Sequence, residues 1–366
     1  MTDSSHQIRD LSPPGEILGE AMEERGVTGA ELARRLGCTE KHVSQLVNGR
    51  VPLTTDMALQ LEQVLGISAQ FWNSLEFNYR SEQKRAEQRQ GYGAFRAWMQ
   101  AFPVAAMRKA GYLPTTVGQT VIERVEALLQ FFGVTSPDAW EAQWQHATAR
   151  FRKAQSFDPD QATVTAWLRR GEIEAARIAC SPYDAESLRA ALPELRGLTR
   201  QPPQLFQPRA VGICASAGVA LTFVPALPKL ALSGATRWIG DKAVVHLSLR
   251  HRTDDQLWFS FFHEICHVLE HKKSAIFLDA VNDHDGDPAE EKANEFAGDI
   301  LLPPDRYAWL LSQWDGRSLA QIQEFANSEG IAPGIVVGRL QHDRRLPFTH
   351  GNKLKQSYVW DYEASS

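Results

Sequence analysis

The segment His-Glu-Ile-Cys-His at positions 263–267 combines side chains that can bind a metal ion and activate water. On a helix, residues i and i+4 lie on one face about 6 Å apart, so His263 and His267 can reach the same cation. Glu264 projects near the same place and can accept a proton from a metal-activated water. With only 11 His among 366 residues the spacing is rare by chance, although two helical histidines can also be purely structural.

The two histidines need a third protein ligand, because a tetrahedral catalytic zinc has three such ligands and one open position. His271 has the right chemistry, but eight helical residues place it about 12 Å along the axis from His263. That separation is too large for metal bonds near 2 Å. We expect His271 to act instead as a cation at the end of the helix.

A second predicted helix offers carboxylate ligands. Asp287 suits the N-cap and Pro288 the first helical position of this helix. Glu290 lies in its first turn, Glu291 is rotated by about 100°, and Glu295 lies more than a turn away. Spacing alone weakly favours Glu290 as the third metal ligand and does not exclude Glu291 or Glu295. The same spacing is also compatible with Glu290 as a simple capping partner of the helix.

The chemistry suggests two further features. Segments 219–224 and 243–247 read as strands, and we expect an extended substrate to pair with a strand edge near 233–238. A donor other than the metal should stabilise the developing oxyanion. The candidates are His246, His284, Arg306 and Tyr307.

The N-terminal region reads as short helices separated by glycine turns. Thr28 and Glu31 have capping-box spacing, and Thr39 can cap the next helix, over 40–48. Short helices around a glycine turn followed by a helix with a polar face are typical of a helix-turn-helix. The polar face of the third helix carries Lys41, His42, Ser44, Gln45 and Asn48.

These polar side chains are candidate DNA contacts, because Gln and Asn can bind adenine edges and Ser and Lys can bind phosphates. The net charge of this region argues against strong DNA binding. Residues 1–80 hold 7 Lys+Arg and 11 Asp+Glu, a net of −4. Phosphate binding gains from cations, so this region should bind DNA weakly as a monomer. A bundle that docks a protein partner is the alternative.

Composition excludes several classes of protein. The chain is 43% hydrophobic and 23% charged, which describes a globular protein of two or three domains. A net charge of −5 excludes a generally basic nucleic-acid binder. No apolar stretch is long enough to span a bilayer, the four cysteines lie far apart, and the start lacks an apolar signal segment. We expect a cytoplasmic protein with reduced thiols and no membrane partner.

The chain divides into four predicted segments. We expect a helix-turn-helix domain over 12–79, a helical linker or middle domain over 80–205, a domain of strands and helices over 206–347, and a loose tail over 348–366. Consecutive prolines after Gln201 mark the second boundary. The predicted fold class is therefore mainly α with a small β-sheet.

The third segment resembles the ImmA/IrrE metallo-endopeptidases. The resemblance rests on the 263–267 motif, on Glu290-x-x-Ala-Asn-x-Phe-Ala with Leu-Leu-Pro behind it, and on Ser-Gly-Ala-Thr-Arg-Trp at 233–238. It implies a zincin-like domain with a small sheet, Zn²⁺ on His263, His267 and Glu290, and Glu264 as the general base.

The first segment resembles Cro/C1-type (XRE) domains, with the HigA-type antitoxin branch as the nearest likeness. The matching residues are Pro-Pro-Gly-Glu-Ile-Leu from Pro13, Glu-Leu-Ala-Arg-Arg-Leu-Gly from Glu31, and Val-Asn-Gly-Arg from Val47. The resemblance implies dimeric binding of operator DNA and, in some members, a toxin partner.

Together these features predict a DNA-binding regulatory zinc endopeptidase that cleaves a Cro/C1-type repressor or a related regulatory protein. The expected cofactor is Zn²⁺, and the expected partners are operator DNA, a protein substrate, a toxin and a second copy of the chain. The alternative is an antitoxin-like transcriptional repressor in which the metal domain is a sensor or a structural module. A third interpretation is a non-peptidase hydrolase that uses the same activated water.

Overall fold

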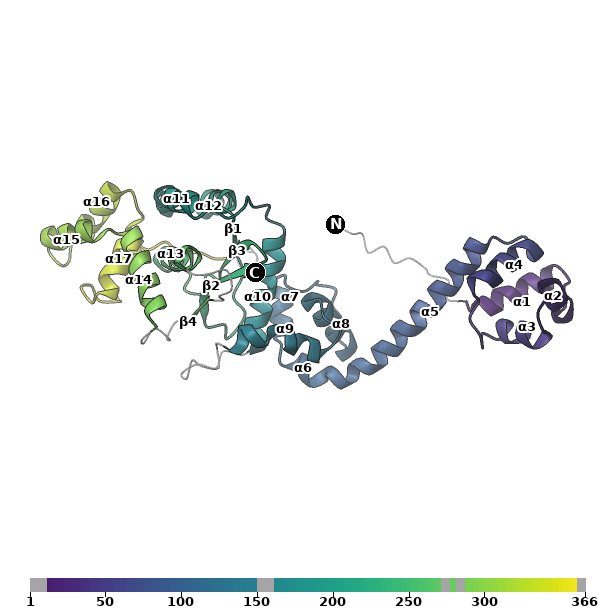
Figure 1. The fold of residues 1–366 in the computed structure, drawn as a ribbon. Helices are drawn as coiled ribbons and strands as arrows, with labels where there is room; N and C mark the ends of the chain where they lie inside the picture. Colours follow the sequence, from purple (N-terminus) through teal and green to yellow (C-terminus); the bar gives the residue numbers. More distant parts are fainter. Residues whose placement is uncertain (1–11, 150–160, 271–276, 281–286, 361–366) are drawn as a thin grey trace. The chain divides into compact units, whose positions relative to one another are not determined.

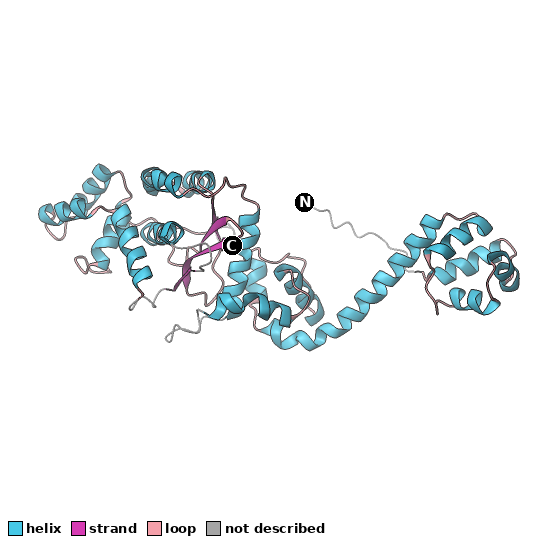
Figure 2. Ribbon diagram, in the orientation of Figure 1, coloured by secondary structure: helices cyan, strands magenta, loops and turns pink. Residues whose placement is uncertain are grey.

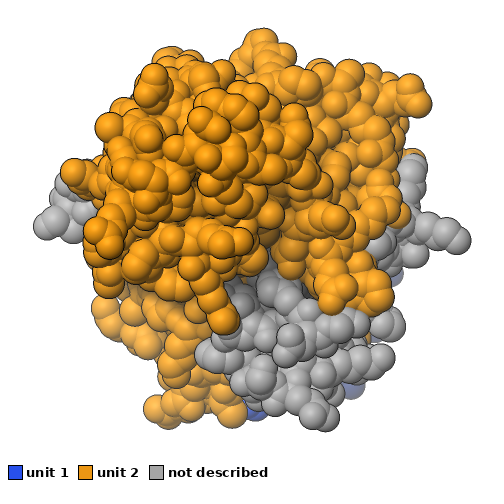
Figure 3. All heavy atoms as spheres, turned by 90° about the vertical axis from the view of Figure 1, so that its left-hand side faces the viewer, with its two compact units in different colours: residues 1–95 blue, residues 96–366 orange. Residues whose placement is uncertain are grey.

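The computed structural model describes residues 12–149, 161–270, 277–280 and 287–360. It is mainly helical with one small β-sheet, which confirms the predicted fold class (Figure 2). The chain forms two compact units, residues 1–95 and residues 96–366, each with its own hydrophobic core. Figure 3 shows mainly the surface of the second unit, drawn in orange. Within the described ranges, the helices are too short or too polar to cross a bilayer.

The first unit is a helical bundle with well-formed helix ends. The hydroxyls of Thr28 and Thr39 accept hydrogen bonds from the N–H groups of Glu31 and His42, as the sequence predicts. Its helices are α1 (Pro14–Glu24), α2 (Gly29–Leu36), α3 (Glu40–Val47), α4 (Thr55–Leu65), α5 (Ala69–Gly91) and the short 3₁₀ helix η1 (Tyr92–Phe95) (Figure 1).

A close approach between α1 and the end of α3 fixes the helix-turn-helix. A Cβ at Gly15 would lie 2.2 Å from the carbonyl oxygen of Val47, so only glycine permits this contact. Leu18, Leu32 and Trp72, each fully buried, fill the core beneath the two helices. Packing thus places the inner face of α3 against the bundle and leaves its polar face outward.

The second unit surrounds its sheet with helices. They are α6 (Arg96–Gln100), α7 (Val104–Lys109), α8 (Val121–Phe132), α9 (Pro137–Ala149), α10 (Gln161–Ala176), α11 (Ala185–Gly197), η3 (Leu198–Arg200), α12 (Pro203–Ser216), α13 (Asp254–Glu270), α14 (Pro288–Leu301), α15 (Pro304–Gln313), α16 (Leu319–Glu329), α17 (Pro333–His342) and η4 (Asn352–Leu354). The predicted boundaries after residues 79 and 205 fall within α5 and α12.

The sheet has four strands in the order β1-β3-β2-β4. They are β1 (Val219–Phe223), β2 (Leu232–Ile239), β3 (Lys242–Leu247) and β4 (Phe277–Ala280). β1 pairs with β3 in parallel, and β2 pairs with both β3 and β4 in antiparallel fashion. The prediction of a free edge near 233–238 is therefore wrong, because β4 occupies the outer side of β2 from Leu232 to Thr236.

Helices cover both faces of the sheet. α13 packs on β2 and β3, where Val245 and Leu247 meet the apolar side of the helix. On the opposite face, α10 packs on β1 and β3, with Ala175 of α10 against Ala220 and Val244. The sheet is thus a buried layer between α13 and a helix from the predicted middle segment.

The described part of the predicted tail packs on the start of α13 through residues 355–358. The N–H of Asp254 donates to the carbonyl of Gln356 at 2.9 Å, and the N–H of Tyr358 donates to the carbonyl of Arg252 at 2.7 Å. Lys355 forms an ion pair with Asp255, with 2.6 Å between Nζ and Oδ2. These contacts hold the N-terminal end of the helix that carries the 263–267 motif.

Candidate metal centre and nucleic-acid interface

The two motif histidines lie side by side on α13, deep in the second unit. Both are 1% exposed, and their Nε2 atoms are 3.0 Å apart. Phe261, Phe262 and Ile265 turn the opposite side of the helix into the core. The helical spacing in the sequence therefore produces a pair of imidazoles that face the same small space.

The first turn of α14 brings Glu290 to this pair. Asp287 caps the helix by accepting a hydrogen bond from the N–H of Ala289, and Pro288 takes the first helical position. Glu290 Oε2 lies 3.0 Å from His263 Nε2, and Oε1 lies 3.5 Å from His267 Nε2. One ligand atom from each of the three residues lies within 4.8 Å of the others, so this group could hold a metal ion.

The competing carboxylates point elsewhere. Glu291 and Glu295 are exposed on α14. His271 and His284 lie outside the described residues. Cys266 is buried within the motif, burial raises the pKa of its thiol to about 11, and its sulfur is not part of the group of ligand atoms formed by His263, His267 and Glu290.

The geometry fits a tetrahedral zinc ion. Bonds of 2.0–2.1 Å at tetrahedral angles place ligand atoms about 3.3 Å apart. The three observed separations, from 3.0 to 3.5 Å, bracket this value. Two imidazole nitrogens and a carboxylate are also a donor set that zinc accepts.

Electrostatics keeps the carboxylate of Glu290 ionised. Burial alone would raise its pKa, but the hydrogen bonds and charges of His263 and His267 outweigh burial and bring the pKa below the ordinary value. The carboxylate is therefore ionised, as a metal ligand must be, and binding a metal also requires the two histidines to lose the Nε2 protons that face it.

Asn294 orients one of the histidines, a role that the sequence analysis missed. Its Oδ1 lies 3.0 Å from Nδ1 of His263. An Nδ1–H that donates to this amide oxygen leaves Nε2 unprotonated and directed at the candidate metal position. The sequence did contain a signal for this role, because Asn294 is four residues after Glu290 and therefore lies on the same face of α14.

Strand β2 holds Glu264, which is fully buried. The hydroxyl of Thr236 donates to Oε2 of Glu264 at 2.5 Å and lies 3.1 Å from its backbone oxygen. A Cβ at Gly234 would lie 2.4 Å from Oε1 of the same carboxylate, so glycine is needed for this approach. Gly234 and Thr236 both belong to the 233–238 segment. The spacing of residues in the sequence does not predict that this segment contacts the motif helix.

The oxyanion candidates lie in other environments. His246 is on β3 between Val245 and Leu247, so its side chain points to the face of the sheet opposite α13. It lies 2.6 Å from the hydroxyl of Thr222 and packs against Trp167. Burial, with a smaller contribution from Arg237, lowers the pKa of His246 to about 3.

Two candidates from α15 have partners of their own. Arg306 pairs with Glu329, with 2.6 Å between Nε and Oε1. Tyr307 is half-buried, and its pKa is raised by burial and by the nearby carboxylate of Asp343. These contacts draw both side chains toward α16 and α17.

The predicted DNA contacts share the outer side of α3 and its end. Lys41, Ser44 and Asn48 are exposed, and His42 and Gln45 are partly exposed. The amide of Asn48 donates to the carbonyl of Ser44 at 2.6 Å, so part of its hydrogen-bonding capacity closes the helix. The hydroxyl of Ser44 also accepts from this amide, at 3.4 Å.

The fold and the two sites define a helix-turn-helix regulator with a metallopeptidase-type domain. Residues 18–72 match the helix-turn-helix family, and residues 218–331 match the M78 peptidase family through its IrrE N-terminal-like domain. The chain therefore belongs to the helix-turn-helix regulators and carries an ImmA/IrrE-type domain in addition.

Two relatives support the regulator assignment. The uncharacterized HTH-type transcriptional regulator YddM of Escherichia coli (strain K12) is 36% identical over 63 residues, 17% of this chain and 67% of that protein. Antitoxin HigA-1 of Vibrio cholerae serotype O1 is 38% identical over 63 residues, 17% of this chain and 59% of that protein. The chain thus spans about three fifths to two thirds of these relatives.

Proposed function

We propose that this chain is a DNA-binding regulatory protein whose second unit binds Zn²⁺ and hydrolyses peptide bonds. The observation that carries the proposal is the convergence of His263, His267 and Glu290 on one buried point. The M78 family match supports a peptidase of this type, and the helix-turn-helix match supports action on transcription.

Each residue of the site has a separate role. Zinc, when bound, supplies positive charge that polarises a carbonyl group and makes water more acidic. Glu264 takes a proton from the attacking water and returns it to the leaving amine. Thr236 holds the Glu264 carboxylate in place, and Asn294 holds the tautomer of His263.

The proposed substrate is a Cro/C1-type repressor or a related regulatory protein. The support is that one chain joins a DNA-binding domain to a peptidase-type domain. Recruitment to an operator would raise the concentration of the enzyme near a DNA-bound repressor. Residues 80–205 would then serve as a spacer or sensor between the two functions.

Cleavage of candidate repressors by the purified, zinc-loaded full chain tests the proposal. We expect two fragments by mass spectrometry, with a rate that falls about 10²- to 10⁴-fold in Glu264→Gln. Glu290→Gln should lose the metal, whereas Glu295→Gln, an exposed acid on the same helix, should not. Wild type and Glu264→Gln behaving alike with every repressor would reject hydrolysis.

The DNA-binding part has its own test. The full chain is titrated by fluorescence anisotropy against the promoter region of its own gene. We expect Gln45→Ala to weaken binding about 10-fold or more, because a bidentate base contact is lost. Gln60→Ala, an exposed glutamine on α4, is the matched control and should bind as wild type does.

The second candidate function is an antitoxin-like repressor in which the metal domain senses or stabilises. The similarity to an antitoxin favours it. It predicts tight promoter binding in both wild type and Glu264→Gln, and no repressor cleavage in either. Metal removal would then change DNA affinity or thermal stability only.

A further inference from the structure

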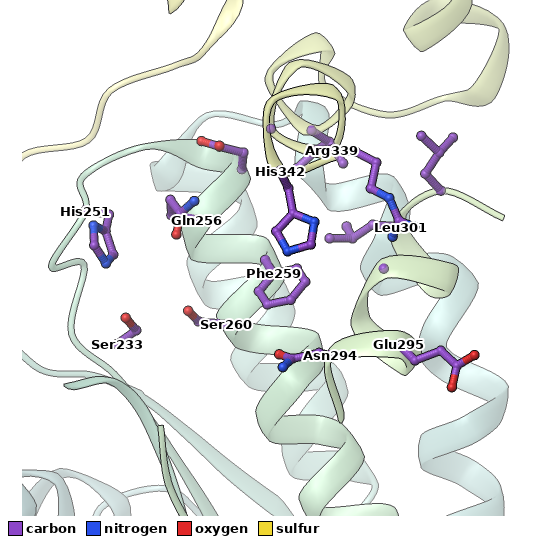
Figure 4. Close-up of a pocket in the computed structure, with 15 residues that line it drawn as sticks. Ser233, His251, Gln256, Phe259, Ser260, Asn294, Glu295, Leu301, Arg339 and His342 are labelled. Atoms are coloured by element: carbon purple, nitrogen blue, oxygen red, sulfur yellow. The ribbon is translucent and has the colours of Figure 1, made fainter. Parts of the chain in front are cut away.

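A pocket of about 480 Å³ opens beside the candidate metal centre, between α13, α14 and α17. Its apolar lining consists of Phe259, Leu301, Leu302 and Ile335. Figure 4 shows Phe259 with His342 and Arg339 of α17 on one side and Asn294 of α14 on the other. The volume is in the range of specific ligand sites and suits a large side chain together with neighbouring backbone.

The pocket adjoins the metal centre, and its lining includes neighbours of His263 but not His263, His267 or Glu290 themselves. Asn294 lines the pocket and also contacts Nδ1 of His263 at 3.0 Å. Phe259 lines it as well, and its ring centroid lies 6.3 Å from that of His263. A side chain near a peptide bond held at the metal would therefore lie close to this pocket.

Charges within the lining already have partners from the protein. Asp255 pairs with Lys355 at 2.6 Å, and Nε of Arg339 contacts Asp343 at 3.0 Å. The guanidinium of Arg339 also lies over the ring of Tyr307 at 5.1 Å. Glu295 is exposed, so it adds charge at the rim rather than in the interior. The wall formed by Phe259, Leu301, Leu302 and Ile335 therefore favours an apolar side chain, while Ser233, Gln256, Ser260 and Asn294 add uncharged polar groups to the lining.

Gly298 lines the pocket from α14. It lies inside α14, where glycine is less favourable than alanine. A Cβ there would meet only the end of Arg339, 2.4 Å away, and that flexible group can move. Gly338, on the other wall, differs, because its Cβ would meet the buried carboxylate of Asp255 at 2.6 Å. Glycine at 338 thus makes room for Asp255 and glycine at 298 makes room for the end of Arg339, and a longer side chain at 298 would displace Arg339 and fill part of the pocket.

We propose that this pocket binds one large apolar side chain, such as phenylalanine, of the polypeptide substrate next to the scissile bond, with Gly298 setting its depth. The proposal deepens the peptidase function above and rests on it. It assigns the substrate class by side chain, independently of which regulator is cleaved.

Peptide binding to the full chain provides a test that does not need turnover. The protein is the Glu264→Gln variant, and the probes are acetyl-Ala-Phe-Ala-amide and acetyl-Ala-Ala-Ala-amide, titrated by ligand-observed NMR. We expect the phenylalanine peptide to bind on the order of 10- to 100-fold more tightly. Adding Gly298→Met should remove this preference. Gly212→Met, at an exposed helical glycine with nothing within 4 Å, should retain it.

If Gly298→Met does not fold, Gly298→Ala replaces it as the test variant, because its single methyl group meets only the movable end of Arg339. We expect Gly298→Ala to reduce the preference for the phenylalanine peptide by about 3-fold. Equal binding of the two peptides, or an unchanged preference in a folded Gly298 variant, would overturn the proposal. Cleavage of repressors without a preference for apolar residues would keep the peptidase function and reject the pocket. A clear preference with no cleavage anywhere would keep the pocket and reject hydrolysis.

Discussion

Replacing Thr236 with valine tests how the fold supports Glu264. Valine has nearly the same shape as threonine and suits a strand, so the backbone of β2 should not change. The substitution removes the hydroxyl that lies 2.5 Å from Oε2 of a fully buried carboxylate. A lost hydrogen bond to a charged group costs about 1.5–3 kcal/mol.

We therefore expect Thr236→Val to lower the free energy of unfolding by about 1.5–3 kcal/mol in urea titrations. Where peptide hydrolysis is measurable, kcat should fall at least about 10-fold while the zinc content stays the same, because the carboxylate is no longer held in position. Thr236→Ser keeps the hydroxyl and should recover most of both quantities.

Thr165→Val is the matched control. Thr165 is also buried, but its hydroxyl donates only to carbonyl oxygens of its own helix, such as that of Gln161 at 2.9 Å. Those carbonyls already take part in the helix, so the variant should lose little stability. Equal unfolding energies for Thr236→Val, Thr165→Val and wild type would refute the role assigned to Thr236.

Three further predictions concern the metal and pH. Metal analysis should give about one zinc per wild-type chain, none in His263→Ala or Glu290→Ala, and an unchanged content in Glu295→Gln; zinc retained in Glu290→Ala would contradict the ligand assignment. Asn294→Ala should weaken zinc affinity about 10- to 100-fold in chelator competition, because His263 loses its orienting partner. His246 has a folded-state pKa of about 3, below its unfolded value, so it stabilises the fold above pH 6.5 and this contribution falls as the pH decreases. Between pH 6.5 and 5 unfolding should become about 2 kcal/mol easier, and His246→Asn should reduce this slope; an equal slope in the variant would show that other groups cause it.

Interactions between residues close together in the sequence determine much of the secondary structure of this protein. Helical periodicity alone puts His263 and His267 on one face, because only 3.6 residues make a turn. The caps at Thr28 and Thr39 define helix starts through contacts three residues apart. Composition and period likewise predicted a mainly helical chain with a small sheet. These features depend on neighbours in the chain, which is why the sequence reveals them.

The tertiary structure decided the rest. Glu290 rather than Glu291 or Glu295 meets the histidines because of how α14 packs on α13. Thr236 reaches Glu264 only because the register of β2 places it under the motif helix. Strand pairing also sends His246 to the far face and covers β2 with β4. Each outcome depends on the relative position of segments that are distant in sequence, which side-chain packing and strand hydrogen bonds fix and local spacing does not encode.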